Sequence, residues 1–272
     1  MLLSVRHTTT YAFETPMRFI AQSHRLHPVD NAAQKIRDWS VTAEGAVFGA
    51  SFTDGAGDRV TTMTAQGPVE TLSIVVKGTV ETFDTTGVLR EHREIISPLV
   101  YLEPTAATAP IGALLELITT TLERAKGTEL ARAHFFCGAV SEAIAYEPGT
   151  TGAHTTAAEA VEQGRGVCQD HAQALVALAR AANMPARYVS GYLMSRGDGG
   201  DEEASHAWAE IWVPGLNWVG FDAANDCCPD DRYIRLGSGR DAREAAPIRG
   251  VSRGGGTEAL DVSVTVAARE QQ

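Results

Sequence analysis

A cysteine stands where a glycine-containing segment meets an apolar run. Residues 164–171 read GRGVCQDH, and the apolar run 172–182 follows directly. The first amide N–H groups of a helix lack partners within the helix, and the helix dipole adds positive potential there. Because a thiolate is the nucleophile and helix N-termini lower the pKa of cysteines, this position favours a reactive Cys168. The alternative is an inert cysteine that packs as a small hydrophobic residue.

A cysteine nucleophile needs a proton acceptor, and that acceptor needs a group that holds its orientation. Both occur on one predicted β-hairpin, in which His206 lies near the start of strand 205–213 and Asp222 ends strand 218–222. The two side chains share a face only if the loop has an odd number of residues or the hairpin contains a bulge. A four-residue loop, 214–217, puts them on opposite faces. The triad hypothesis therefore depends on the hairpin register.

Each of these residues also has a purely structural interpretation. His206 alone could bond a backbone carbonyl within a strand, and Asp222 alone could end a strand by accepting from turn amides. Trp208, Trp212 and Trp218 are typical of core and cleft walls rather than of a cofactor site. The combination is what favours catalysis: glycine–cysteine at a helix start, His-x-Trp on one strand and Trp-x-Gly-x-Asp on the next.

The helix behind the cysteine is indicated by an apolar stripe of helical period, formed by Ala172, Leu175, Val176, Ala179 and Ala182. Asn183 suits the position just past a helix end, and Pro185 prevents continuation. Further helices are expected over residues 111–125 and 129–145. A capping-box pattern that begins at Thr156 predicts another short helix before residue 164.

The first part of the chain reads as β structure. Hydrophobic residues alternate over residues 3–13, and short strand-like runs follow at residues 36–41, 46–53, 60–65 and 72–80. This spacing is typical of a small β-sandwich. We therefore expect an N-terminal β-rich domain over residues 1–82, a proline-punctuated connector over residues 83–110 and a catalytic domain over residues 111–272. One more strand is expected near the end, from alternation at Leu260, Val262, Val264 and Val266.

Composition excludes several classes of function. A net charge of −11 over 272 residues argues against nucleic acid as a partner. The sequence shows neither a signal-peptide pattern nor an apolar run that could span a membrane, so we expect a cytoplasmic protein without membrane association. Four cysteines at positions 137, 168, 227 and 228 are too few and too unevenly placed for a disulfide framework, and they offer no zinc-ligand spacing. We expect no metal and no cofactor.

The motifs resemble those of the bacterial transglutaminase-like cysteine proteases. The resemblance is carried by GVCQD at residues 166–170, MPARYVSGY at 184–192, SHAWAE at 205–210 and WVGFD at 218–222. GRD at 239–241, APIRGV at 246–251 and the β-rich start extend the similarity over nearly the whole chain. In one departure, the family often has Asp-Pro-Thr-Asn where this chain has Asp-Ala-Ala-Asn at 222–225, which affects the turn more than the triad.

This resemblance implies an α+β fold with a papain-like core, in which the helix bearing the cysteine packs on an antiparallel sheet. It implies Cys168 as nucleophile, His206 as base and then acid, and Asp222 as the residue that orients the histidine. The Cys168 N–H is a natural oxyanion donor at the helix start, and Gln169 is a weak candidate for the second donor.

Attack on an amide carbonyl gives a thioester, and the next acceptor decides the reaction. Water makes the protein a protease or amidase, whereas a substrate amine makes it a transglutaminase, and the triad is the same for both. The absence of an evident amine-acceptor signature favours hydrolysis of a peptide or protein substrate. The alternatives are a transglutaminase-type acyl transferase and a non-catalytic binding module in which the β-rich region carries the function.

Overall fold

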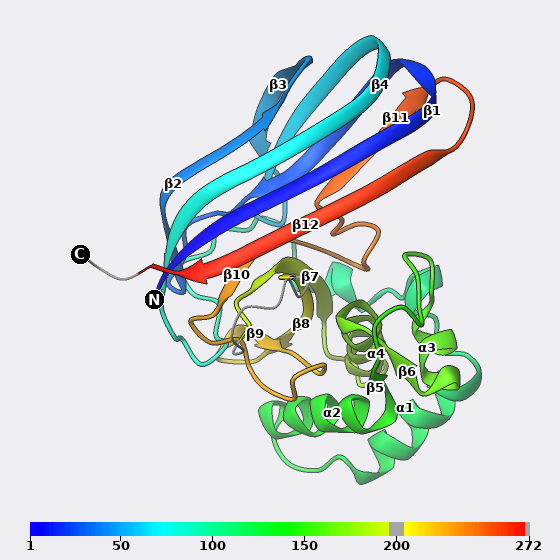
Figure 1. Ribbon diagram of the computed structural model, residues 1–272. Coiled ribbons are helices and arrows are strands. Elements are labelled where there is room, and N and C mark those ends of the chain that lie inside the picture. Colours follow the sequence, from blue (N-terminus) through cyan, green and yellow to red (C-terminus); the bar gives the residue numbers. More distant parts are fainter. Residues whose placement is uncertain (196–203, 270–272) are drawn as a thin grey trace.

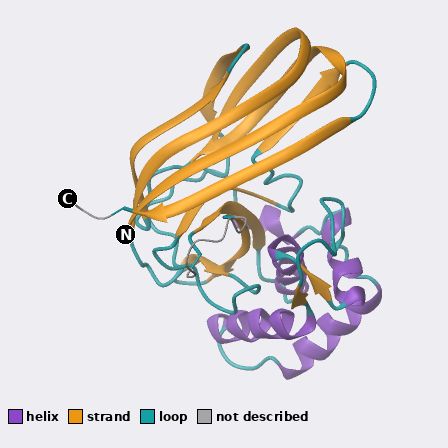
Figure 2. Cartoon of the chain, in the orientation of Figure 1, coloured by secondary structure: helices purple, strands orange, loops and turns teal. Residues whose placement is uncertain are grey.

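The computed structural model describes residues 1–195 and 204–269. This part of the chain contains two antiparallel sheets of different size, and the helices gather beside the smaller sheet (Figures 1 and 2). The expected α+β class is confirmed. Within these residues, no helix is long and apolar enough to cross a membrane. The acidic segment 196–203 lies outside the described residues.

The larger sheet is built on two long strands that lie side by side. Its strands are β1 (Leu2–His27), β2 (Gln34–Ala43), β3 (Ala46–Thr53), β4 (Arg59–Thr82), β11 (Ile248–Arg253) and β12 (Glu258–Ala268). β1 pairs with β12 over residues 3–13 and with β11 over residues 19–24. β4 divides in the same way, because its first part pairs with β3 and its last part with β2. One layer contains the first half of β1 and the last part of β4, with β12 and β2. The other layer contains the second half of β1 and the first part of β4, with β11 and β3.

Side chains from the two layers share buried clusters, as in a sandwich. Leu72 lies in one cluster with Met17 and Met63, and Leu26 lies in another with Ile74. Apolar residues on opposing sheet faces stabilise such a pair of layers by leaving water together. The expected sandwich-like region is therefore confirmed, although the two runs predicted at 60–65 and 72–80 belong to the single strand β4.

The last two strands of the predicted catalytic domain, residues 111–272, belong to the larger sheet, and the domain bounds stay a prediction. β11 and β12 pair with β1, so the end of the chain completes the sheet that the first 82 residues build (Figure 1). The strand β12 itself was expected from its alternating residues. Its partner was not, because alternation shows that a strand has two faces but does not identify the strand beside it.

The smaller sheet has the order β10-β7-β8-β9 and supports the cysteine helix. Its strands are β7 (Ala186–Leu193), β8 (Ser205–Val213), β9 (Asn217–Phe221) and β10 (Tyr233–Gly239). The helices are α1 (Gly112–Arg124), α2 (Glu129–Ala143), α3 (Ala157–Gln163) and α4 (Cys168–Ala181), with short 3-10 turns η1 (Pro98–Leu102) and η2 (Ala106–Thr108) before them. Two short strands, β5 (Ala145–Tyr146) and β6 (Arg165–Gly166), pair in parallel.

Helix α4 begins and ends where the sequence indicated. It packs on β7 and β8, and its residues from Asp170 to Arg180 are buried. Asn183 has a φ of +59°, as expected just past a helix end. The capping box at Thr156 also forms, since Glu159 N donates to Thr156 Oγ1 and Thr156 N donates to the Glu159 carboxylate. A cysteine helix on an antiparallel sheet is thus confirmed.

A buried ionic cluster joins the two sheets. Arg235 of β10 contacts Asp58, in the turn between β3 and β4 of the larger sheet, at 2.6 Å and Glu210 of β8 at 2.9 Å. Arg187 of β7 contacts Glu210 at 2.6 Å and Glu94 of the connector at 2.7 Å. Burial alone raises the pKa of Glu210, but the two arginines outweigh it and lower the pKa to about 2. Removing one member would leave a buried charge uncompensated, which typically costs about 3–5 kcal/mol.

Candidate active site

Cys168 is the first residue of helix α4 and is half-buried. The backbone before it is fixed by the buried Asp170 carboxylate, whose Oδ2 accepts from Val167 N at 2.8 Å and from Thr151 Oγ1 at 2.6 Å. A Cβ on Gly166 would lie 2.6 Å from that same oxygen, so the close approach requires glycine. The contacts of Gly166 and Val167 with Asp170 therefore fix the backbone on either side of the cysteine.

The hairpin register meets the condition that the triad hypothesis set. Val213 pairs with Asn217, so the loop contains the three residues 214–216. With an odd loop, continuing the register past β9 brings Asp222 opposite Trp208, on the face that His206 shares. The two side chains meet, with His206 Nε2 and Asp222 Oδ2 2.6 Å apart.

The Asp222 carboxylate is fully buried and heavily hydrogen-bonded. Its Oδ2 accepts from His206 at 2.6 Å, from Tyr233 Oη at 2.7 Å and from Asn225 Nδ2 at 2.7 Å. Its Oδ1 accepts from the backbone N–H groups of Ala224 at 3.0 Å and Asn225 at 3.3 Å. Burial alone raises the pKa of this carboxyl, but the hydrogen bonds and the charge of His206 outweigh it, so the pKa is lowered. Asp222 is thus held as an oriented anion.

His206 connects this carboxylate to the cysteine. Burial alone lowers the pKa of His206, whereas hydrogen bonds to Asp222 and to the Cys168 side chain raise it to about 10. Since Nε2 faces Asp222, Nδ1 is the nitrogen left for the sulfur. The imidazole also lies against the rings of Trp208 and Tyr233, at centroid distances of 6.5 Å and 5.9 Å. The structure therefore joins His206 and Asp222 by a hydrogen bond, and Cys168 is among the groups that raise the pKa of this histidine.

Sequence reasoning missed two residues of this site. Tyr233 lies on β10, a strand that was not predicted, and its hydroxyl reaches Asp222. Asn225 belongs to the quoted Asp-Ala-Ala-Asn turn, and that turn was the available signal for it. The weak candidate for an oxyanion donor, Gln169, directs its amide toward Gly152 O at 3.4 Å. A second oxyanion donor stays a prediction.

A cleft of about 620 Å³ opens beside His206. Its apolar lining comes from the segment after α2 and from the end of β7, and includes Tyr146, Pro148, Leu193 and Met194. Such a cleft suits a peptide chain that approaches the histidine. Within residues 1–195 and 204–269, no group of three or more His, Cys, Asp or Glu side chains could hold a metal ion.

Comparisons with known proteins agree with this fold. Residues 118–223 match the model of the transglutaminase-like superfamily, and residues 3–81 match that of the bacterial transglutaminase-like N-terminal region. An uncharacterized protein of Mycobacterium leprae is 30% identical over 282 residues, which cover 97% of this chain and 98% of that protein. An uncharacterized protein of Mycobacterium bovis is 38% identical over 135 residues, 46% of this chain and 43% of that protein.

A solved structure from Cytophaga hutchinsonii, described as a candidate cysteine protease, has the same fold. It superposes with a TM-score of 0.76 at 21% identity, over 100% of this chain and 92% of that one. The fold and the matched regions define a transglutaminase-like core preceded by a bacterial N-terminal β region. The chain belongs to the transglutaminase-like superfamily, a family of cysteine-based enzymes.

Proposed function

We propose that the protein is a cysteine-dependent protease or amidase that works through a thioester acyl-enzyme. The observation that carries this proposal is the 2.6 Å hydrogen bond between His206 and Asp222, with Cys168 at the start of helix α4 among the groups that raise the pKa of His206. The cleft beside His206, lined by both apolar and polar side chains, supports a peptide or protein substrate. The net charge of −11 supports the absence of a nucleic-acid partner. A cytoplasmic location belongs to the same proposal, and cell fractionation tests it.

The mechanism follows from the side chains. The Cys168 thiolate, paired with the His206 imidazolium, attacks the amide carbonyl carbon, and the Cys168 N–H at the helix start faces the developing oxyanion. As the C–N bond breaks, His206 gives its proton to the leaving amine and a thioester remains. His206, now neutral, takes a proton from water while the water oxygen attacks the thioester. The thiolate then leaves, the acid product departs and the imidazolium is restored.

Product analysis separates hydrolysis from acyl transfer. Peptides with internal glutamine are incubated with the purified protein, with and without a primary amine, and the products are identified by mass spectrometry. We expect cleaved or deamidated peptides in both mixtures and no accumulation of the amine adduct. An adduct that forms faster than the hydrolysis product would identify a transglutaminase instead. If no peptide reacts and iodoacetamide labels Cys168 no faster than an unfolded control, a binding module becomes the better interpretation.

The pH dependence of activity reports the protonation of His206. Hydrogen bonds to Asp222 and Cys168 raise the pKa of His206 from 6.5 to about 10, against the lowering effect of burial. The raised pKa means that the imidazolium persists through neutral pH and is lost only as the pH rises toward 10. We therefore expect the alkaline limb of kcat/KM to lie far above pH 6.5.

Rates measured between pH 6 and 11 at constant ionic strength check this, with circular dichroism confirming that the protein stays folded. An alkaline limb near pH 6.5 in the folded protein would contradict the ion pair.

A further inference from the structure

Tyr233 contacts two of the three triad residues, Asp222 and His206. The side chain is buried, its hydroxyl donates to Asp222 Oδ2 at 2.7 Å, and its ring meets the imidazole of His206 edge-on at 63°. Burial raises the pKa of the phenol, and the charge of Asp222 raises it further, so the hydroxyl keeps its proton and acts as a donor. Since Oδ2 is also the atom that faces His206 Nε2, the phenol fixes the oxygen that the histidine uses.

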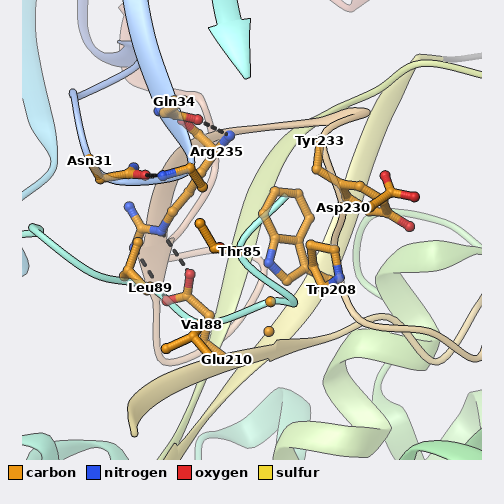
Figure 3. Close-up of a pocket in the computed structure, with 14 residues that line it drawn as sticks. Asn31, Gln34, Thr85, Val88, Leu89, Trp208, Glu210, Asp230, Tyr233 and Arg235 are labelled. Atoms are coloured by element: carbon orange, nitrogen blue, oxygen red, sulfur yellow. Dashed lines mark hydrogen bonds and ion pairs between the residues drawn. The ribbon is translucent and has the colours of Figure 1, made fainter. Parts of the chain in front are cut away.

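The strand that carries Tyr233 is held from the larger sheet. Two residues further along β10, the backbone of Arg235 forms two hydrogen bonds with the Gln34 side chain, at 2.8 Å and 2.9 Å. The Arg235 guanidinium contacts Asp58 at 2.6 Å. Figure 3 shows Gln34 against Arg235, and Tyr233 beside Trp208 in the wall of the same small cavity. The larger sheet and the triad therefore meet through one short strand.

We propose that Tyr233 is a positioning residue for the Asp222–His206 pair, and that the larger sheet holds Tyr233 in place through Arg235. This inference rests on the proposed function, because it concerns how the same triad is oriented. A carboxylate oxygen with three donors has little freedom to turn. The ring of His206 is likewise confined, between Asp222 and the aromatic side chains. The N-terminal region thereby acquires a role in catalysis, since it fixes the residue that aims the carboxylate.

The variant Tyr233→Phe tests the first link. It removes the hydroxyl and keeps the ring, so Asp222 Oδ2 loses one of its three donors and the weak contact of the hydroxyl with Cys227 Sγ at 3.5 Å is lost. We expect kcat to fall about tenfold while KM stays within about twofold, because only the orientation of the pair changes. The matched control is Tyr192→Phe, which also removes a buried hydroxyl. Tyr192 lies on the opposite face of β7 and β10 from Tyr233, and its hydroxyl bonds His7 Nδ1 at 2.8 Å. We expect the control to keep the wild-type kcat.

The variant Gln34→Met tests the second link, because it removes both side-chain hydrogen bonds to Arg235. We expect kcat to fall severalfold in the folded protein. If Gln34 acts through Tyr233, then adding Gln34→Met to Tyr233→Phe lowers kcat little further. Asp58→Asn weakens the ion pair with Arg235 at almost constant volume and serves where Gln34→Met does not fold. If the fold-changes in kcat of the two single variants multiply in the double variant, the link between the larger sheet and Tyr233 is overturned.

A readout without substrate keeps the two proposals separate. The rate at which iodoacetamide labels Cys168 at pH 7 reports the thiolate that the oriented His206 stabilises. We expect slower labelling of Tyr233→Phe than of the wild type and of Tyr192→Phe. If the wild type hydrolyses no peptide but this difference remains, the proposed function fails and the positioning role stands. If Tyr233→Phe labels and turns over as the wild type does, the positioning role is overturned.

Discussion

Replacement of Cys168 by alanine is expected to abolish turnover and leave the fold intact. Removing the nucleophile of a catalytic triad lowers kcat on the order of 10⁶-fold in a well-studied hydrolase, and only background hydrolysis remains. The side chain is half-buried at the first position of α4, where alanine is well tolerated. Its loss therefore removes little packing. Peptide turnover measured beside thermal unfolding should show no activity and a melting temperature within a few degrees of the wild type.

The matched control for this variant is Cys228→Ala. Cys228 is half-buried as well, but burial raises the pKa of its thiol to about 11, so it stays protonated at neutral pH. We expect Cys228→Ala to keep the wild-type turnover and the wild-type rate of iodoacetamide labelling at Cys168. Turnover that survives in Cys168→Ala would remove the thioester mechanism. Equal losses in both variants would point to a structural effect of thiol removal.

Local patterns were enough to predict the helix and the hairpin. The apolar stripe behind Cys168 has the period of a helix, and a helix start is a local electrostatic feature that needs no knowledge of the rest of the fold. The strand that carries His206 was equally clear from its residue types. What the pattern could not decide was the loop, because adding Asn217 to it turns three residues into four and moves Asp222 to the other face.

Long-range contacts were beyond local patterns for a physical reason. Each residue of β10 is buried, so the strand shows no alternation that could separate it from a loop or a helix end. Tyr233 therefore carried no signal, although it lies within hydrogen-bonding distance of Asp222. β12 was predicted as a strand, yet its pairing with β1 joins residues from opposite ends of the chain. The same limitation hid the link between Arg235 and Asp58, since two charges far apart in sequence do not reveal that they share a buried site.

The second large effect is expected for Asp222→Asn. In the wild type, Oδ2 accepts from three donors and Oδ1 from two backbone N–H groups, so both oxygens act only as acceptors. An amide offers one oxygen and one NH₂ group, and either orientation sets an N–H donor against other donors. The negative charge that stabilises the His206 imidazolium is lost as well. The same change in a serine protease triad lowers kcat about 10⁴-fold, and we expect a fall on the order of 10³–10⁴ here.

The pH profile of Asp222→Asn distinguishes lost charge from a disturbed turn. Because the hydrogen bond and charge of Asp222 raise the pKa of His206, the variant should move the alkaline limb of kcat/KM down toward neutral pH. Asp226→Asn is the control, since Asp226 is exposed and has a φ of +47°, a conformation that asparagine accepts readily. It should keep both the rate and the limb. If Asp222→Asn lost activity with its alkaline limb unchanged, the carboxylate would hold the turn at 222–225 without supporting the charge of His206, and the imidazolium would need another anion.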